Sequence, residues 1–207
     1  GQPASDDVLV YEEKDERFEV GIGKTLSKAY LLLSISSGRT SEYRYVDAKT
    51  PDKEFRPLLP RREGITYSMQ HRGDQFYIRI NDTARDFRVV TAPVADPSEK
   101  NWKEVVAPAK GLYVQSMLLL KSHVVYLLRV NGLHTLRVVD LDRNESHDIK
   151  FDEQAYSLGF TGNAEFDTNL LRFGYSSMVT PQSTYDYDLT TRQRTLLKQQ
   201  EVLGGYN

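Results

Sequence analysis

The sequence predicts an all-β fold, a β-propeller fragment of about four blades, each a four-stranded antiparallel sheet. The chain has 13 tyrosines and 8 phenylalanines among 207 residues, and aromatic and β-branched side chains favour strands. Short apolar segments also occur in pairs separated by polar turns, as in β-hairpins. The turn centres, near residues 39, 83, 131 and 179, are about 44 to 48 residues apart, which is a propeller-blade period.

Four predicted hairpins follow one another along the chain. The paired segments are Tyr30–Ser36 with Ser41–Asp47, Gln75–Ile80 with Phe87–Thr91, His123–Val130 with Leu133–Leu141, and Asn169–Tyr175 with Thr184–Asp188. Asn131-Gly132 is the strongest turn signal, because both central positions of a type I′ turn need positive φ. Glu104–Ala107 and Thr195–Lys198 are expected to add a further strand to the second and fourth units.

Side-chain alternation indicates which faces of these strands are buried. Phe76, Ile78 and Ile80 share one face of their strand, because successive side chains of a strand point to opposite sides. The predicted blades are approximately residues 8–62, 63–109, 110–157 and 158–205, so that residues 1–207 form one partial propeller. Regular strand spacing also suits a β-sandwich, which is the alternative fold.

Composition excludes several classes of protein. With 27 basic and 29 acidic residues the formal net charge is -2, whereas nucleic-acid-binding domains usually carry a basic excess. The absence of cysteine excludes disulfides, thiolate zinc sites and cysteine nucleophiles. No segment approaches the roughly 18 apolar residues of a membrane span, so no membrane partner is expected. Gly1–Val10 lacks signal-peptide features, which favours a cytoplasmic protein, with a periplasmic one as the alternative.

Two segments resemble catalytic motifs only in part. Val20–Thr25 ends in Gly-Lys-Thr, but Phe18 stands where a phosphate-binding loop needs glycine and a strand follows instead of a helix. We therefore expect a turn between two strands there. Gly174–Met178 lacks the second glycine of a serine-hydrolase elbow. No catalytic residue is predicted in this chain.

Other polar residues are expected to be structural. His71, His123, His134 and His147 do not have the spacing of metal ligands, so neither a metal site nor a cofactor is predicted. The mixed-charge run Glu12–Arg17 is interpreted as a solvated connector between blades. Trp102 is expected to pack across a blade edge.

One set of segments carries a family resemblance. These segments are Leu9–Phe18, Thr40–Arg44, Leu59–Arg62, Gln75–Asn81, Gly132–Arg137, Phe151–Tyr156 and, most specific, Leu171–Pro181, followed by Tyr187–Leu189 and Leu197–Gln199. In this order they resemble the non-catalytic propeller of the oligopeptidases B, serine peptidases of the prolyl oligopeptidase family. Thr66, where the family has an acidic residue, and Gly21–Gly23, where it has bulkier ones, depart from the pattern.

The resemblance implies a fold, partners and an activity. The chain would be the C-terminal part of a seven-bladed propeller, with Asn207 near the start of the family's α/β-hydrolase domain. That domain, which holds the Ser-Asp-His triad, is absent here, so the chain alone should be inactive. It would cap an enzyme that cleaves short peptides after Arg or Lys. The partners would be the missing blades, the hydrolase domain and, because four blades leave two faces uncovered, a second copy.

Contacts with the hydrolase domain or substrate are expected at turns with exposed polar and aromatic groups. The candidates are Glu42, Tyr43, Arg44, Tyr175 and Ser176; the alternative for each is ordinary packing at a strand end. The alternative for the whole chain is a stand-alone propeller that binds a peptide or protein through its central face.

Overall fold

Sixteen strands make up almost all of the secondary structure in residues 3–204, the part of the chain that the computed structural model describes. They form four antiparallel sheets of four strands each. The first contains β1 (Glu19–Lys24), β2 (Tyr30–Ser36), β3 (Ser41–Asp47) and β4 (Arg56–Pro57). The second contains β5 (Tyr67–Arg72), β6 (Gln75–Ile80), β7 (Arg88–Pro93) and β8 (Lys103–Val106). The third contains β9 (Leu112–Leu119), β10 (His123–Val130), β11 (Leu133–Asp140) and β12 (Glu145–Asp148). The fourth contains β13 (Tyr156–Phe160), β14 (Leu170–Ser177), β15 (Ser183–Asp188) and β16 (Arg194–Gln199).

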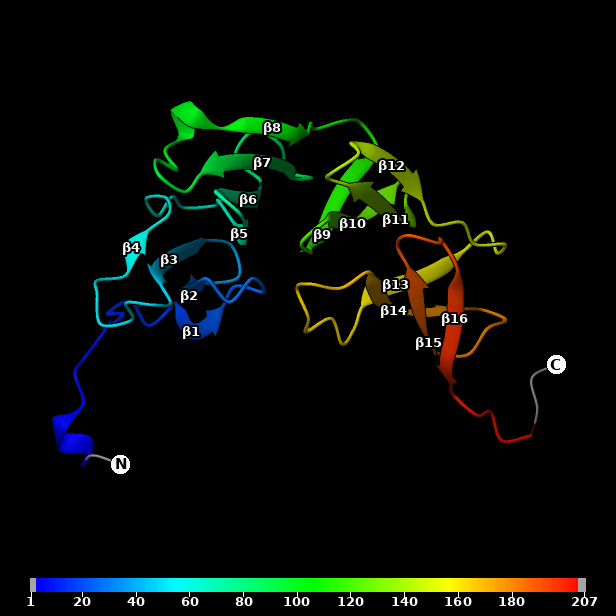
Figure 1. Ribbon diagram of the computed structural model, residues 1–207, viewed down its shortest axis with the longest axis horizontal. Helices are drawn as coiled ribbons and strands as arrows, with labels where there is room; N and C mark the ends of the chain where they lie inside the picture. The colour runs from blue at the N-terminus through cyan, green and yellow to red at the C-terminus, as the bar shows by residue number, and fades with distance from the viewer. Residues whose placement is uncertain (1–2, 205–207) are drawn as a thin grey trace.

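The four sheets follow one another around an arc (Figure 1). In each sheet the strands are neighbours in chain order, and β1, β5, β9 and β13 lie on the concave side of the arc, whereas β4, β8, β12 and β16 lie on its convex side. Two short 3-10 helices, η1 (Ala4–Asp6) and η2 (Glu99–Asn101), complete the secondary structure of the described residues. This arrangement confirms the prediction of an all-β partial propeller. Asn207 lies outside the described residues.

Three clusters of buried side chains hold consecutive sheets together. Phe76 and Ile78 lie in the cluster between the first and second sheets, Tyr126 in that between the second and third, and Leu136 and Phe173 in that between the third and fourth. The predicted face of Phe76, Ile78 and Ile80 is fully buried. The core of the molecule therefore lies between sheets, as expected for stacked blades.

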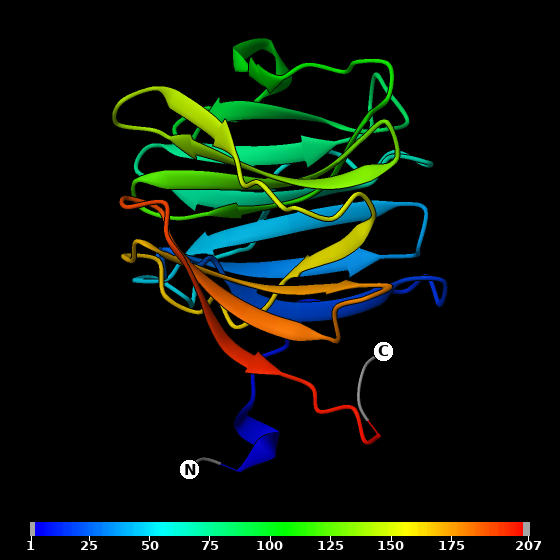
Figure 2. The same cartoon turned by 90° about the vertical axis from the view of Figure 1, so that its right-hand side faces the viewer.

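The turns gather on two opposite rims (Figure 2). The turns β2–β3, β6–β7, β10–β11 and β14–β15 lie on one rim, called the β2–β3 rim below, and the turns β1–β2, β5–β6, β9–β10 and β13–β14 lie on the other. Two backbone hydrogen bonds join neighbouring sheets at the β2–β3 rim. The N–H of Ser41 donates to the carbonyl of Ile65, and the N–H of Val114 donates to the carbonyl of Asp86.

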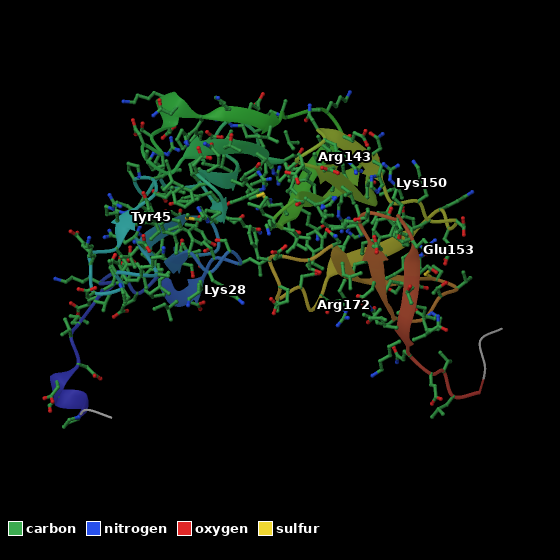
Figure 3. The ribbon with its side chains drawn as sticks, viewed as in Figure 1. Lys28, Tyr45, Arg143, Lys150, Glu153 and Arg172 are labelled. Carbon is green, nitrogen blue, oxygen red and sulfur yellow. The ribbon has the colours of Figure 1, made fainter. Side chains whose placement is uncertain are left out.

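The β1–β2 turn also reaches the far end of the arc. Leu26 packs against the cluster between the third and fourth sheets, and Lys28, on the concave side of the arc (Figure 3), lies 3.9 Å from the carboxylate of Glu165 in the β13–β14 loop. The first and fourth sheets are thus linked across the arc at this rim.

The outer faces of the two terminal sheets differ. On the first sheet, Leu33 and Val46 are covered by a cluster that includes Tyr11, whereas β1 leaves Val20 and Ile22 exposed at 46% and 75%. On the fourth sheet, Arg172 (Figure 3) pairs with Asp186 at 2.7 Å on the outward side. The expectation of two uncovered blade faces is therefore wrong in part, because residues 11–18 fold back over the first one.

Several predicted boundaries need correction. Val20–Lys24 lies in β1, paired with β2, so the predicted turn begins after it, at Thr25. Phe87 precedes β7 instead of beginning it, and Ser176 and Ser177 extend β14. The fourth sheet begins at Tyr156, two residues before the predicted blade at 158. Turn and strand-end residues carry little pattern, so hydrogen bonding decides these limits.

Candidate functional site

The five predicted contact residues lie near the β2–β3 rim, at opposite ends of the arc. Glu42, Tyr43 and Arg44 are at the start of β3 in the first sheet, and Tyr175 and Ser176 are near the end of β14 in the fourth. The structure therefore brings them to one rim and does not bring the two groups together.

Glu42 is the centre of a buried ionic cluster. Its carboxylate is 2.6 Å from Nε of Arg44 and 2.9 Å from Nε of Arg61, and the residue is only 4% exposed. Arg61 also pairs with Glu13 at 2.5 Å, and this hydrogen bond lowers the pKa of Glu13 to about 2. The prediction that Glu42 is exposed is wrong, as is the solvated interpretation of Glu13.

The same cluster ties residues 11–18 to the first sheet. The guanidinium of Arg44 lies 4.9 Å from the ring centroid of Tyr11, and that of Arg61 lies 4.0 Å from the centroid of Phe18. Ion pairs and cation–π contacts together hold residues 11–18 in place against the first sheet. This geometry favours the structural alternative for Glu42 and Arg44.

Tyr43 takes part in an aromatic contact between the first two sheets. Its backbone N–H donates to the hydroxyl of Tyr67 at 2.8 Å, and the two ring centroids are 5.3 Å apart. Burial raises the pKa of Tyr67 to about 12. Burial raises the pKa of Tyr43 as well, so both phenols stay protonated at neutral pH, and that of Tyr67 serves as a hydrogen-bonding group.

Tyr175 is also buried, contrary to the prediction. Its hydroxyl donates to the carboxylate of Glu153 (Figure 3) at 2.9 Å, and the hydroxyl of Thr180 donates to the same oxygen at 2.6 Å. The ring stacks on Phe151 at 5.1 Å. These contacts fix the β12–β13 and β14–β15 loops against each other.

Ser176 points to the opposite face of its sheet. It lines a cavity of about 270 Å³ together with Gly159, Gly174 and Gln182. The lining residues include neither a histidine nor an acid, which a serine nucleophile needs as its base. The cavity suits packing or ligand contact and not bond cleavage.

Ser27, among the residues that the structure describes, contacts a histidine. The hydroxyl of Ser27 is 2.8 Å from Nδ1 of His71, and Nε2 of His71 is 2.8 Å from the carbonyl of Gly73. Both ring nitrogens thus have partners other than an acid, and Ser27 lies on the β1–β2 loop whereas His71 lies on β5. The pair joins the first two sheets, and the bond from His71 to Gly73 orders the β5–β6 turn.

Sequence reasoning missed Arg79 on β6. Its guanidinium lies 3.4 Å from the ring centroid of Phe87 and 6.0 Å from that of Tyr113, and Nε donates to the carbonyl of Val114 at 2.6 Å. Burial lowers the pKa of Arg79, and the hydroxyls of Tyr113 and Tyr43 oppose that effect. An arginine in an apolar strand segment gave no signal, because its surroundings come from three different sheets.

The described residues contain no cluster of three or more histidine, cysteine or acidic side chains that could hold a metal ion. Nor does any described helix have the length and apolar character needed to cross a membrane.

Curated relatives contain a segment similar to this chain within a longer protein. The chain is 40% identical over 205 residues to dipeptidyl aminopeptidase BI of Pseudoxanthomonas mexicana, covering 99% of this chain and 28% of that protein. It is 30% identical over 207 residues to protease 2 of Moraxella lacunata, covering 100% of this chain and 29% of that one. The chain thus spans less than a third of these relatives.

Solved structures show the same relationship. Oligopeptidase B from Trypanosoma brucei, with covalently bound antipain in a closed form, superposes with a TM-score of 0.90 at 26% identity, covering 100% of this chain and 31% of that one. Oligopeptidase B from Leishmania major gives a TM-score of 0.89 at 22% identity, covering 100% and 30%. Residues 1–200 match the family model of the prolyl oligopeptidase N-terminal β-propeller domain, and the chain therefore belongs to the propeller domain of the prolyl oligopeptidase family.

Proposed function

We propose that this chain is the substrate-screening propeller of a serine oligopeptidase that hydrolyses short peptides after Arg or Lys. The observation that carries the proposal is the superposition of the whole chain on part of an oligopeptidase B that holds covalently bound antipain. The catalytic serine, histidine and aspartate would come from the hydrolase domain, and the propeller would contribute by excluding large substrates and positioning small ones.

Exposed apolar residues support a larger propeller. Val8, Leu9 and Val10 are 84%, 76% and 61% exposed. Eight residues separate Val10 from β1, and five to nine residues separate the outermost strand of each sheet from the innermost strand of the next. We infer that Val8–Val10 forms the outer strand of a preceding blade, which would also cover Val20 and Ile22.

The β2–β3 rim is the side that would face the hydrolase domain. β16 ends at Gln199, which pairs with Ser183 at the start of β15 on this rim, and the matching family domain is described as N-terminal, so further chain would follow there. The predicted residues Glu42, Tyr43, Arg44, Tyr175 and Ser176 lie near the same rim. Of these, Tyr43, Arg44 and Ser176 keep some exposure. Arg44 is held by Glu42, so Tyr43 and Ser176 are the residues that would contact the hydrolase domain or substrate.

The first test is the coding sequence beyond Asn207. We expect an open frame that reaches a Gly-x-Ser-x-Gly elbow and then Asp and His, in that order. A stop codon within a few residues would contradict the proposal and favour a stand-alone propeller that binds a peptide or protein partner. Pull-down of a peptide partner by the 207-residue chain would then be the experiment to pursue.

The second test is activity of the full-length protein. A blocked short peptide with one internal arginine should be cleaved after that residue, whereas a folded protein with exposed arginines should resist. Replacement of the elbow serine by alanine is the control, because it removes the nucleophile and leaves the propeller intact. Equal cleavage of both substrates would contradict screening by the propeller.

A second candidate activity is the release of N-terminal dipeptides, which the 40% identity to a dipeptidyl aminopeptidase favours. The same assay separates the two activities. Cleavage of the blocked peptide indicates an endopeptidase, whereas cleavage only of peptides with a free amino terminus, two residues at a time, indicates a dipeptidyl peptidase.

A further inference from the structure

We propose that Arg79 is the anion-binding group of a carboxylate site on the β2–β3 rim. The proposal rests on the proposed function, because it assigns the carboxylate either to the C-terminus of a bound short peptide or to an acidic side chain of the hydrolase domain.

The first observation is a half-buried charge without an acid. Among the described residues, other half-buried arginines pair with carboxylates: Arg61 with Glu13 and Glu42, and Arg88 with Asp82 at 2.7 Å. No described carboxylate forms an ion pair with Arg79, and none is among the groups that shift its pKa. Partly buried cations are normally paired, because desolvation disfavours an isolated charge.

The second observation is backbone strain beside that charge. Phe87 has a φ of 65°, a region that bulky side chains rarely adopt. Such strain costs free energy and persists where the surrounding structure imposes it, often at ligand sites. Here it places the Phe87 ring against the guanidinium of Arg79 and edge-on to Tyr113 at 6.0 Å.

The resulting geometry suits a carboxylate. The carbonyl of Val114 accepts from Nε, which fixes the plane of the guanidinium. The hydroxyl of Tyr113 is a further hydrogen-bonding neighbour of the group, and the two terminal nitrogens form a fork of parallel donors. A carboxylate accepts two such hydrogen bonds side by side. The rings of Phe87 and Tyr113 shield the group from water, and an anion there would be held more strongly than at an open surface.

Both sources of a carboxylate are compatible with the position. Arg79 is at the end of β6 next to the β6–β7 turn, on the rim where the hydrolase domain and its substrates would lie. A peptide of a few residues presents its terminal carboxylate close to the cleaved bond. A hydrolase-domain acid would instead pair with Arg79 only when the two domains are closed.

The test compares C-terminal acid and C-terminal amide forms of one blocked, arginine-containing peptide on the full-length protein. The variants are Arg79→Met, which removes the charge, and Arg79→Lys, which keeps the charge and loses the fork. Arg85→Met is the matched control, because Arg85 is exposed on the same turn.

If the peptide supplies the carboxylate, the wild type should show a KM about tenfold lower for the acid peptide than for the amide. Arg79→Met should abolish that preference without changing KM for the amide.

If the hydrolase domain supplies the carboxylate, the wild type should treat acid and amide alike. Arg79→Met should then slow cleavage of the acid and the amide peptide equally and shift small-angle scattering towards an open form. Arg85→Met should do neither. A folded Arg79→Met protein that keeps the wild-type ratio of KM values for acid and amide, and that also keeps wild-type cleavage and scattering, would overturn the site. If that variant does not fold, Arg79→Lys decides, and a wild-type profile for it would equally overturn the proposal.

Failure of the proposed function gives a different pattern. A wild-type protein that cleaves neither peptide contradicts the peptidase activity and leaves the site open to direct binding. Calorimetric titration with both peptides then decides, since equal affinity for acid and amide, together with unchanged scattering in Arg79→Met, would overturn the carboxylate site.

Discussion

Gln70 and Leu119 belong to different sheets and are joined by a hydrogen bond of 2.7 Å from the backbone N–H of Leu119 to Oε1 of Gln70. The other end of the same carboxamide donates through Nε2 to the carbonyl of Met117 at 2.7 Å. Ser41 bonds to Tyr67 in the same way. Its hydroxyl accepts from the backbone N–H of Tyr67 at 2.7 Å and donates to the backbone carbonyl of Tyr67 at 3.1 Å. Side chains of one blade thus satisfy the free backbone edge of the innermost strand in the next blade, which would otherwise lack partners.

Gln70→Leu should therefore destabilise the propeller by about 2 kcal/mol, because it leaves a backbone N–H and a carbonyl at the blade interface without partners. The measurement is urea unfolding of the full-length protein. Gln154→Leu makes the same chemical change at an exposed loop position and should alter stability by less than about 0.5 kcal/mol. Equal effects of the two substitutions would show that the edge contacts contribute nothing.

Glu42→Gln should release residues 11–18 from the first sheet. The substitution leaves Arg44 and Arg61 without the carboxylate that joins them, and loss of one partner in a buried ionic cluster costs about 3 kcal/mol. Brief trypsin treatment should then cut faster at Lys14 and Arg17. Glu12→Gln, at an exposed position of the same segment, is the control. Cleavage at the same rate in both variants would refute the role of the ionic cluster in holding residues 11–18 against the first sheet.

Local sequence signals predicted the hairpins well because turn chemistry is local. Asn131 and Gly132 have φ of 51° and 89°, as their residue types require, and they set the register of β10 against β11. The site was less predictable. Glu42 looked exposed because its segment is polar, whereas its carboxylate is enclosed by Arg44 and by Arg61, which is 19 residues away in sequence. Arg79 had no signal because its isolation depends on where the nearby acids go: Asp82, three residues away, pairs with Arg88.

Stability should fall as the pH is lowered below about 6.5. Burial lowers the pKa of His71, so the folded state favours the neutral ring, whose Nε2 donates to Gly73 and whose Nδ1 accepts from Ser27. The unfolded chain takes up this proton more readily, and the contribution of His71, complete above the unfolded pKa, is lost as pH falls through the folded one. Burial lowers the pKa of His147 as well, which adds in the same direction.

The check on this pH effect is a comparison of unfolding free energies at pH 8 and pH 5 for the wild type and His71→Gln. Glutamine can form hydrogen bonds and does not titrate, so the variant should lose less stability over this range. Parallel profiles for the two proteins would remove His71 from the explanation and leave His147 to be tested in the same way.

Gly132→Ala should destabilise the third blade, because its φ of 89° lies in a region that is costly for any side chain. The expected loss is about 1 to 2 kcal/mol, although open space surrounds the position that the new methyl group would occupy. Gly23→Ala is the matched control: it also has open space around the added carbon and an ordinary φ, in a strand where alanine costs less backbone entropy than glycine. That variant should be neutral or slightly more stable in urea unfolding. A similar loss of unfolding free energy in Gly132→Ala and Gly23→Ala would mean that the I′ turn does not limit stability. The Asn131-Gly132 pair would then set the register of β10 and β11 without contributing to the free energy of folding.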